Sequence, residues 1–482
     1  MVDVHPRSGN TPPYDPLPEA AARRIVDAAL AILRETGVQF DADPELLDLF
    51  AGAGCDVSAA GLVKFDADCV RAALDSVAKS VTLWNRAGTE SIEIRDGNTC
   101  FFPGMTAIRV IDWTTGETRA SCREDLATIA RVGDALPEID GVCVPCKIVE
   151  HSNLQGEIEE FAVLAANTSK PLEYLCESDA ALEAAIEMAA ALRGGAERLA
   201  EKPYFLHGVT PLPLCYAKCH SDQILRAVRS GVPLAVGTVN IGGASTPISI
   251  AGNLAHALAT DLAALVLGQL VRRGSFCIGC SDVGFMDPAS GGLGGFSQSW
   301  LAEQAVGQIC RLLGIPSLTG MAGRNRAARF DDTAIADLTA SMLHTFHSRP
   351  ATCDYLGLVE GGLTYSLHAL LFCHDLIGML RSLWRGIRVD DETLAVDVVR
   401  AVGPRGNYLA QPHTVAHCRE ELWQSRYLRR PPRAPGERVG VSERIAADLR
   451  EILATHRPEP LDASSRARLR AILELRGAAP VV

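Results

Sequence analysis

A glycine-rich turn between Gly279 and Gly292 carries two carboxylates, Asp282 and Asp287. Glycine lets the backbone approach a ligand closely, and acids in such a loop can take up a proton or hold a cation. We therefore predict a catalytic role for Asp282 and a substrate contact for Asp287. The alternative, given equal weight, is a surface turn in which an aspartate caps the next helix.

A second carboxylate, Glu360, precedes two glycines and lies shortly after Tyr355. A quaternary ammonium offers no hydrogen bond, so cation–π contact and ion pairing have to hold it. Glu360 is predicted to be catalytic and Tyr355 to contact substrate. For the tyrosine alone, packing in the core is the favoured alternative.

His207 lies late in the apolar run from Phe205 to Val209. An imidazole there could shuttle a proton, and we predict a catalytic role for it. The alternative is a structural histidine whose ring nitrogens are hydrogen-bonded. No P-loop, nucleophile elbow or H-E-x-x-H motif accompanies these residues.

These residues share one position, since each follows a short apolar run and precedes a helical stretch. In a barrel of parallel strands such positions form the active-site face. Asn240, Arg324 and Asn325 meet the same criterion and are predicted to bind substrate. The other residues at this position are Lys147, Glu177, Thr210, Thr238, Cys280 and Asp354.

The apolar runs recur roughly 30 to 40 residues apart, as successive βα units do. Seven such runs, with an eighth at 101–112, predict a (β/α)8 TIM barrel. A doubly wound open sheet is the alternative, although no G-x-G-x-x-G follows the first run. The predicted strands are 141–148, 171–176, 204–209, 233–239, 275–280, 317–321 and 351–356.

The barrel is predicted to span residues 99–395. A helical N-terminal extension is expected over 1–98, with helices near 18–37, 43–53 and 66–76. A helical C-terminal segment is expected over 396–482.

The net charge of −12 on 482 residues argues against nucleic acid and anionic lipid as partners. The first residues lack the apolar core of a signal peptide, and polar residues interrupt the longest apolar stretch, near 254–271. We therefore expect a cytoplasmic protein, and a homo-oligomer. The fifteen cysteines are then expected to be reduced thiols, and the C-x-x-C pairs at Cys143 and Cys277 buried thiols rather than a zinc site.

Several stretches resemble the trimethylamine:corrinoid methyltransferase family, which includes glycine betaine methyltransferases. They follow one another along most of the chain, so that their order is more specific than any one of them. The stretches are Ala29-x-x-Ile32-Leu33-x-x-Thr36-Gly37-Val38, Ser80 to Arg86, Phe102-Pro103-Gly104, Asp112-x-x-Thr115-Gly116-Glu117, Met286-Asp287-x-x-Ser290-Gly291, Leu358 to Thr364, and Val402 to Leu409 with Pro412-His413-Thr414.

The resemblance implies a barrel that passes a methyl group from an amine to the Co(I) of a separate corrinoid protein. No cofactor is then expected to be bound tightly. Members that act on methylamines use pyrrolysine, which this sequence lacks, so a quaternary amine such as a betaine is the expected substrate. Arg324 or Arg326 is expected to bind the betaine carboxylate, unless these arginines pair with Asp331 or Asp332. Two alternatives are a tetrahydrofolate-type acceptor and a non-catalytic amine-binding homologue.

Overall fold

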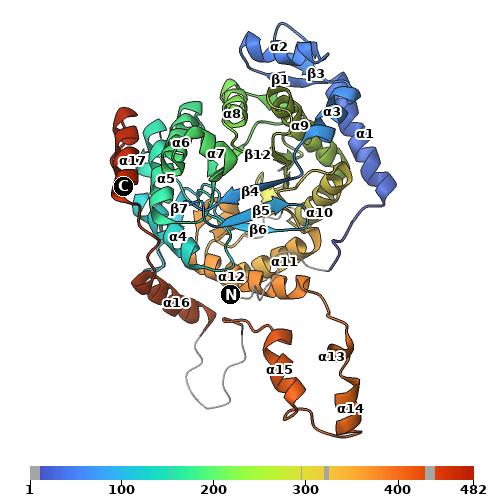
Figure 1. The fold of residues 1–482 in the computed structure, drawn as a ribbon. Coiled ribbons are helices and arrows are strands. Elements are labelled where there is room, and N and C mark those ends of the chain that lie inside the picture. Colours follow the sequence, from blue (N-terminus) through green and yellow to red (C-terminus); the bar gives the residue numbers. More distant parts are fainter. Residues whose placement is uncertain are drawn as a thin grey trace.

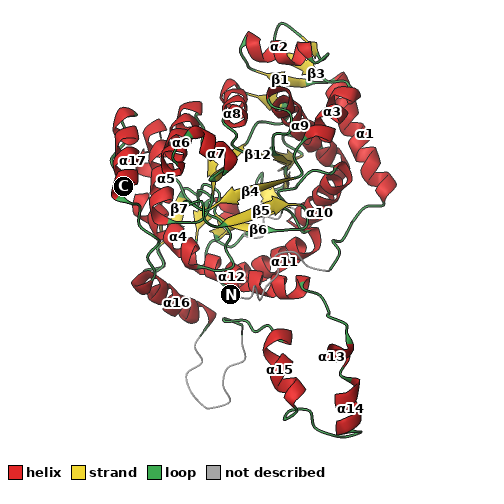
Figure 2. Cartoon of the chain, viewed as in Figure 1, coloured by secondary structure: helices red, strands yellow, loops and turns green. Residues whose placement is uncertain are grey.

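Strands occupy the centre of the molecule and helices surround them, in an arrangement that mixes both kinds of element (Figures 1 and 2). The computed structural model describes residues 11–151, 153–279, 281–294, 296–319, 325–428 and 440–481.

Parallel strands form the central sheet. Four strands lie side by side in the order β14 (Cys277–Gly279), β12 (Leu234–Val236), β10 (Phe205–Val209) and β9 (Leu172–Leu175). A separate parallel pair joins β6 (Cys100–Pro103) to β17 (Thr352–Leu356). These six strands confirm six of the predicted strands, and each is shorter than predicted.

Single bridges connect these groups of strands. Val142 bridges to Leu172, Gly279 to Ser317 and Leu318 to Thr352, all in parallel. The predicted strand at 141–148 is wrong in extent, because Pro145 has no N–H to donate to a ladder. Since the strands belong to separate sheets, a closed eight-stranded barrel remains a prediction.

Helices follow the central strands along the chain. The helical stretches that the repeat predicts after the apolar runs are present. They are α4 (Arg123–Ala135), α5 (Leu154–Asn167), α6 (Asp179–Arg193), α8 (Lys218–Arg229), α9 (Ile250–Val271), α10 (Phe296–Leu313), α11 (Asp332–Ser348) and α12 (Leu367–Trp384). Two short helices, η1 (Val149–His151) and α7 (Ala196–Glu201), lie between them.

Helix α9 is long and apolar enough to cross a membrane, yet 83% of its most apolar window is buried within the protein. It packs against α1 and α3 from the N-terminal region, and α8 lies on it as well. Its hydrophobicity is therefore that of a core helix, which is apolar on all sides because neighbours cover all sides.

Two small sheets follow the carboxyl ends of the central strands. One contains β13 (Val239–Gly242), β15 (Asp282–Met286) and β16 (Leu293–Gly294). The other contains β18 (Leu358–Val359), β19 (Thr364–Tyr365), β7 (Arg109–Ile111) and β8 (Thr118–Ala120), with the single turn η2 (Glu360–Gly362) beside it.

The N-terminal region contains the three predicted helices, α1 (Glu19–Glu35), α2 (Pro44–Gly52) and α3 (Ala67–Ser76). It also contains the short strands β1 (Val38–Phe40), β2 (Asp56–Val57) and β3 (Leu62–Lys64), which form a sheet with β11 (Cys215–Tyr216). The sequence did not predict this sheet, since each strand is only two or three residues long.

The hairpin of β4 (Ser80–Trp84) and β5 (Ser91–Arg95) covers the amino ends of the central strands. The Trp84 N–H donates to Pro203 O at 2.9 Å, just before β10 begins. Apolar side chains of the hairpin share a buried cluster with side chains of the central strands. This cluster contains Leu83, Ile92, Ile94, Cys100, Phe102, Cys143, Leu206, Ala235, Phe276, Ile278, Leu318 and Ala351.

The C-terminal region has two parts. Helices α16 (Val441–Thr455) and α17 (Ala463–Leu475) pack against α4, α12 and α6. Helices α13 (Asp391–Leu394), α14 (Val396–Val402) and α15 (Pro412–Glu421) instead form an arm, residues 387–422, that projects from the body (Figure 1).

Candidate active site

Two carboxylates face the interior of the central strands. On β9, Leu172 and Tyr174 pack outward in the main hydrophobic core, so Glu173 between them points inward. On β17, Cys353 packs outward in the same core, and Asp354 follows it. Glu173 is 1% exposed and Asp354 is 0% exposed.

The Glu173 and Asp354 carboxyl groups act on one another. Burial raises the pKa of Asp354 to about 7. Burial and the charge of Asp354 raise the pKa of Glu173 well above its usual range. The two carboxyl groups are hydrogen-bonded to each other. Among the described residues, no other hydrogen-bond partner is shown for either oxygen of Asp354 or for Glu173 Oε2. Ionisation of both carboxyl groups is therefore opposed, because two buried like charges are costly.

Several residues near Asp354 have strained, left-handed backbone conformations. Tyr355 and Glu360 adopt φ angles of 64° and 55°, and Thr106, which follows the adjacent strand β6, has a φ of 56°. The register of the β6–β17 pair also shifts between Cys353 and Leu356. Left-handed conformations of residues other than glycine cost free energy, and they cluster at functional sites.

An ion pair lies near this strained segment, between Arg109 at the start of β7 and Glu360. Arg109 Nη2 is 3.2 Å from Glu360 Oε2, and both side chains are about one-third exposed. The Thr364 hydroxyl donates to the same carboxylate oxygen at 2.5 Å. Opposite charges are therefore fixed close together at the carboxyl ends of β6 and β17.

Asn325 belongs to the same corner as Glu360. Its amide donates to Leu358 O at 2.7 Å, and its main-chain oxygen accepts from the Gly361 N–H at 2.8 Å. These bonds make Asn325 a support for the Glu360 turn. Arg324 lies outside the described residues. Arg326 pairs with Asp337 at 2.8 Å rather than with Asp331 or Asp332.

Asn240 and Asp282 meet in the other small sheet, where their strands β13 and β15 pair in parallel. Asn240 Nδ2 donates to Thr238 Oγ1 at 2.6 Å and lies 3.3 Å from the main-chain oxygen of Asp282. Both residues are buried, and Asn240 Oδ1 has no partner among the described residues. The structure thus brings Asn240 and Asp282 together in one small sheet. Glu360 and Asn325 form a second group, at a later part of the chain.

His207 and Asp287 lie in structural surroundings. His207 is fully buried between β10 and α8, with Nδ1 3.0 Å from Tyr174 O and Nε2 3.3 Å from Gln223 Oε1. Burial lowers the pKa of His207 to about 4. Asp287 lies in an exposed turn and accepts from the Ser290 hydroxyl at 2.7 Å. These contacts match the structural alternative for both residues, so their predicted roles in chemistry remain predictions without geometric support.

Glu173 and Arg109 were not predicted from the sequence, and Asp354 was predicted only to lie at a strand end. A charged residue inside the apolar run 171–176 was the available signal, because an unpaired acid in a buried strand is expensive. Cys143 and Cys146 pack in different hydrophobic clusters. Cys280, of the second C-x-x-C pair, lies outside the described residues. Over the described part of the chain, no three His, Cys, Asp or Glu side chains are placed to hold a metal ion.

Comparison with known proteins decides the family. The sequence model of trimethylamine methyltransferase (MTTB) matches residues 3–479. The chain belongs to this family. It is therefore an enzyme of the methyltransferase class.

Two relatives within the trimethylamine methyltransferase family illustrate the substrates its members are named for. The trimethylamine methyltransferase MttB of Desulfitobacterium hafniense is 28% identical, over 93% of this chain and 91% of the relative. The glycine betaine methyltransferase of the same species is 26% identical, over 97% and 98%. Among solved structures, the Methanosarcina barkeri monomethylamine methyltransferase MtmB aligns with a TM-score of 0.48 and 12% identity, over 96% of this chain and 94% of that one.

Proposed function

We propose that this enzyme removes a methyl group from a small quaternary amine such as a betaine and passes it to the Co(I) of a corrinoid protein. Family membership supports the methyl transfer, and one relative is named for glycine betaine. The sequence contains only the twenty standard residues, which favours a quaternary amine over the methylamines.

The observation that carries the betaine assignment is the ion pair of Arg109 and Glu360. A betaine has one ammonium and one carboxylate, so it needs charges of both signs at a short separation. Arg109 and Glu360 provide them 3.2 Å apart, with part of each side chain open to solvent. A guanidinium binds a carboxylate through two parallel hydrogen bonds, and a carboxylate attracts a quaternary ammonium.

The chain's own residues then orient the substrate for in-line displacement. Arg109 holds the substrate carboxylate, and Glu360 holds the cationic nitrogen on the strained turn. The C–N electron pair stays on nitrogen, so the amine departs neutral and needs no acid catalyst. A corrinoid supplies the attacking electron pair when its carrier protein docks. Fixing the methyl carbon against the attacking group accelerates transfer, since orientation entropy is lost before the reaction.

Anaerobic incubation with Co(I) cobalamin and a panel of betaines, with and without a corrinoid protein, tests this function. Formation of the methyl-Co(III) spectrum with one betaine is the expected result. Formation of methylated tetrahydrofolate instead of methyl-Co(III) would identify a tetrahydrofolate as the methyl acceptor. Recovery of every betaine unchanged would contradict the proposal.

Substitution Arg109→Gln tests the binding geometry. We expect the KM for a betaine to rise about tenfold or more, because one charged hydrogen-bonded contact is lost. Binding of tetramethylammonium, which has no carboxylate, should change little. Arg119→Gln is the matched control, since Arg119 is similarly exposed and pairs with Asp125 instead. Equal effects of both variants on betaine would place Arg109 outside the site.

We also infer that the central strands close into a (β/α)8 barrel. The bridges at Val142, Ser317 and Leu318 support this inference, because they link the four-stranded sheet toward β6 on one side and β17 on the other. The Cys143 N–H also donates to Pro103 O at 3.2 Å, beside β6. A cytoplasmic location and a homo-oligomeric state complete the proposal, the latter supported by the exposed apolar arm.

A further inference from the structure

Two cysteines of the N-terminal region, Cys55 and Cys69, have their sulfur atoms in contact. The Sγ atoms lie 3.8 Å apart, and one thiol donates a hydrogen bond to the other. Both are free thiols. They are 14 residues apart along the chain, so two different elements bring them together. At this distance one sulfur can attack a disulfide formed at the other.

Separate pieces of backbone fix the positions of these two thiols. Cys55 follows the end of α2, where its N–H donates to Phe50 O at 3.0 Å and Gly54 adopts a φ of 85°. Cys69 lies in the first turn of α3, after the N-cap residue Asp66. Helices α2 and α3 both pack against α9, so packed helices hold the two sulfur atoms together.

The two thiols differ in exposure and in acidity. Cys55 is 8% exposed and belongs to the main hydrophobic core, whereas Cys69 is half-buried at the edge of that core. The hydrogen bond between them lowers the pKa of Cys69 to about 7 and, together with burial, raises the pKa of Cys55. The amino end of a helix also favours a thiolate, although the charge of Asp66 opposes it. Cys69 is therefore the better nucleophile of the two.

Cys122 shows that the start of a helix does not by itself make a thiol acidic. It is half-buried at the N-cap of α4, but burial and a hydrogen bond with Asp125 raise the pKa of Cys122 to about 11. In the core, burial raises the pKa of Cys277 and of Cys373 to about 12. A thiol attacks as its thiolate, so these three cysteines are poorer nucleophiles than Cys69.

We propose that Cys55 and Cys69 form a redox-active dithiol, which a low-molecular-weight disulfide such as oxidised glutathione converts to an intrachain disulfide. The Cys69 thiolate attacks one sulfur of the oxidant, which forms a mixed disulfide and releases the first molecule of thiol. Cys55 then loses its proton and attacks Cys69 Sγ, which closes the intrachain disulfide and releases the second. Two electrons pass from the protein to the oxidant, and the two thiol protons end on the released thiols.

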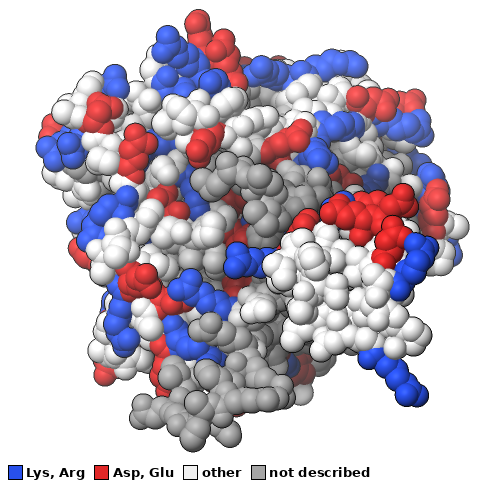
Figure 3. Space-filling model, turned by 60° about the horizontal axis from the view of Figure 1, so that its bottom comes forward, with Lys and Arg blue, Asp and Glu red and all other residues white. Residues whose placement is uncertain are grey.

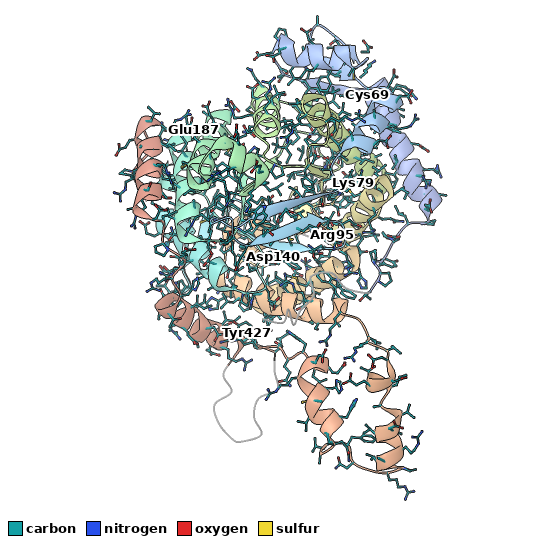
Figure 4. All side chains as sticks on the ribbon, in the orientation of Figure 1. Cys69, Lys79, Arg95, Asp140, Glu187 and Tyr427 are labelled. Atoms are coloured by element: carbon teal, nitrogen blue, oxygen red, sulfur yellow. The ribbon has the colours of Figure 1, made fainter. Side chains whose placement is uncertain are left out.

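This site is separate from the proposed methyl transfer and does not depend on it. Cys69 lies in the N-terminal region, on α3 (Figure 4). The disulfide links the end of α2 to the start of α3 and closes the loop that contains β2 and β3.

Tryptic mapping of the intact protein after treatment with oxidised glutathione tests the proposal. Remaining thiols are alkylated before a digest without reductant. Trypsin cleaves at Lys64, between the two cysteines, so Cys55 and Cys69 fall in the peptides 35–64 and 65–71, which contain no other cysteine. We expect these two peptides to be joined, with a mass two hydrogens below their sum, and to separate on addition of dithiothreitol.

Serine variants distinguish the roles of the two thiols. Cys55→Ser should stop at a glutathione adduct on Cys69, because no thiol is left to resolve it. Cys69→Ser should leave Cys55 unmodified, because that thiol is buried and protonated. Cys122→Ser, the matched control at the start of α4, should form the joined peptides at the wild-type rate.

Several results would overturn the proposal. They are a lasting glutathione adduct on Cys69 in the wild type, linkage of either cysteine to another residue or chain, and equal modification of Cys55 with and without Cys69. Failure of peptide 65–71 to react while the exposed Cys418 is fully modified would also overturn it. If a serine variant fails to fold, the wild-type map still decides.

Discussion

At the scale of single residues, the acid pair is the feature with the largest consequences. Glu173 and Asp354 lie on β9 and β17, within the strand interior, and their ionisation is opposed by burial. An acid whose pKa is raised by folding stabilises the native state at low pH and loses that contribution as pH rises through the folded pKa. The pair therefore makes the ligand-free protein sensitive to pH at neutrality.

The expected result is a fall in the free energy of unfolding between about pH 4 and pH 7. With the Asp354 pKa raised to about 7 from its ordinary value, the loss begins above that ordinary value and is complete above about pH 7. The slope attributable to the pair is on the order of 1 kcal/mol per pH unit. Urea unfolding at several pH values measures it.

Asp354→Asn should remove this part of the slope and make the variant more stable than the wild type at pH 8. If the free energy of unfolding had the same pH dependence in the wild type and in Asp354→Asn, the slope could not be assigned to the acid pair.

At the scale of elements, a buried ion cluster of Arg381, Glu138 and Asp140 links helix α12 to the central strands. Arg381 is 3% exposed, and its guanidinium contacts Glu138 and lies 2.8 Å from Asp140 Oδ2. Asp140, labelled in Figure 4, also accepts from the Phe101 N–H at 2.9 Å. The cluster thus joins α12 to β6, the strand that pairs with the segment of Asp354.

Arg381→Met should lower the free energy of unfolding by about 3–5 kcal/mol, because it leaves Asp140 as a buried charge without its base. The double variant with Asp140→Asn should lose less than the single one. Arg388→Met is the control, since Arg388 is half exposed and its ion pairs contribute at most about 1 kcal/mol. Chemical denaturation of the four proteins gives these values; equal losses for Arg381→Met and Arg388→Met would refute the role of the cluster.

Helices were predictable because their periodicity extends over many residues, as in α1 and α3, whose predicted bounds of 18–37 and 66–76 are nearly those observed. Strand extents were less predictable, since Pro145 ends a ladder that the apolar run at 141–148 suggested. Among site residues, Glu360 and Asn325 were found because they follow strands. Glu173 was not predicted because it lies inside a strand, whereas the predicted site residues all lie at strand ends. Arg109 was not predicted because its partner, Glu360, is distant from it in the sequence.

At the scale of the whole molecule, the arm at 387–422 stands apart from the body. None of the residues in α13, α14 and α15 is buried. With the bottom of Figure 1 turned forward, Figure 3 shows the arm as a largely uncharged surface bordered by charged side chains. Its exposed apolar residues are Ile387, Val389, Leu394, Val396, Val399, Tyr408, Leu409, Val415 and Leu422.

Both ends of the arm are attached to α12. The chain leaves the body after that helix and returns where the Arg426 N–H donates to Asp375 Oδ1 at 2.8 Å and Trp423 lies against Gly378. Helices of this length are unstable alone in water, so the arm requires a covering surface. A second copy of the chain is the occupant that the proposed homo-oligomer supplies.

Leu409→Lys and Val415→Lys should therefore weaken self-association while leaving monomer stability nearly unchanged, because both side chains are exposed in the single chain, 79% and 69%. Light scattering across micromolar concentrations should show a shift toward smaller species. Leu475→Lys on α17, where the side chain is 80% exposed, is the matched control and should leave the mass unchanged. A wild-type protein that is monomeric throughout would remove the second copy as the occupant, and loss of methyl transfer to a corrinoid protein in the same variants would then assign the arm to that partner instead.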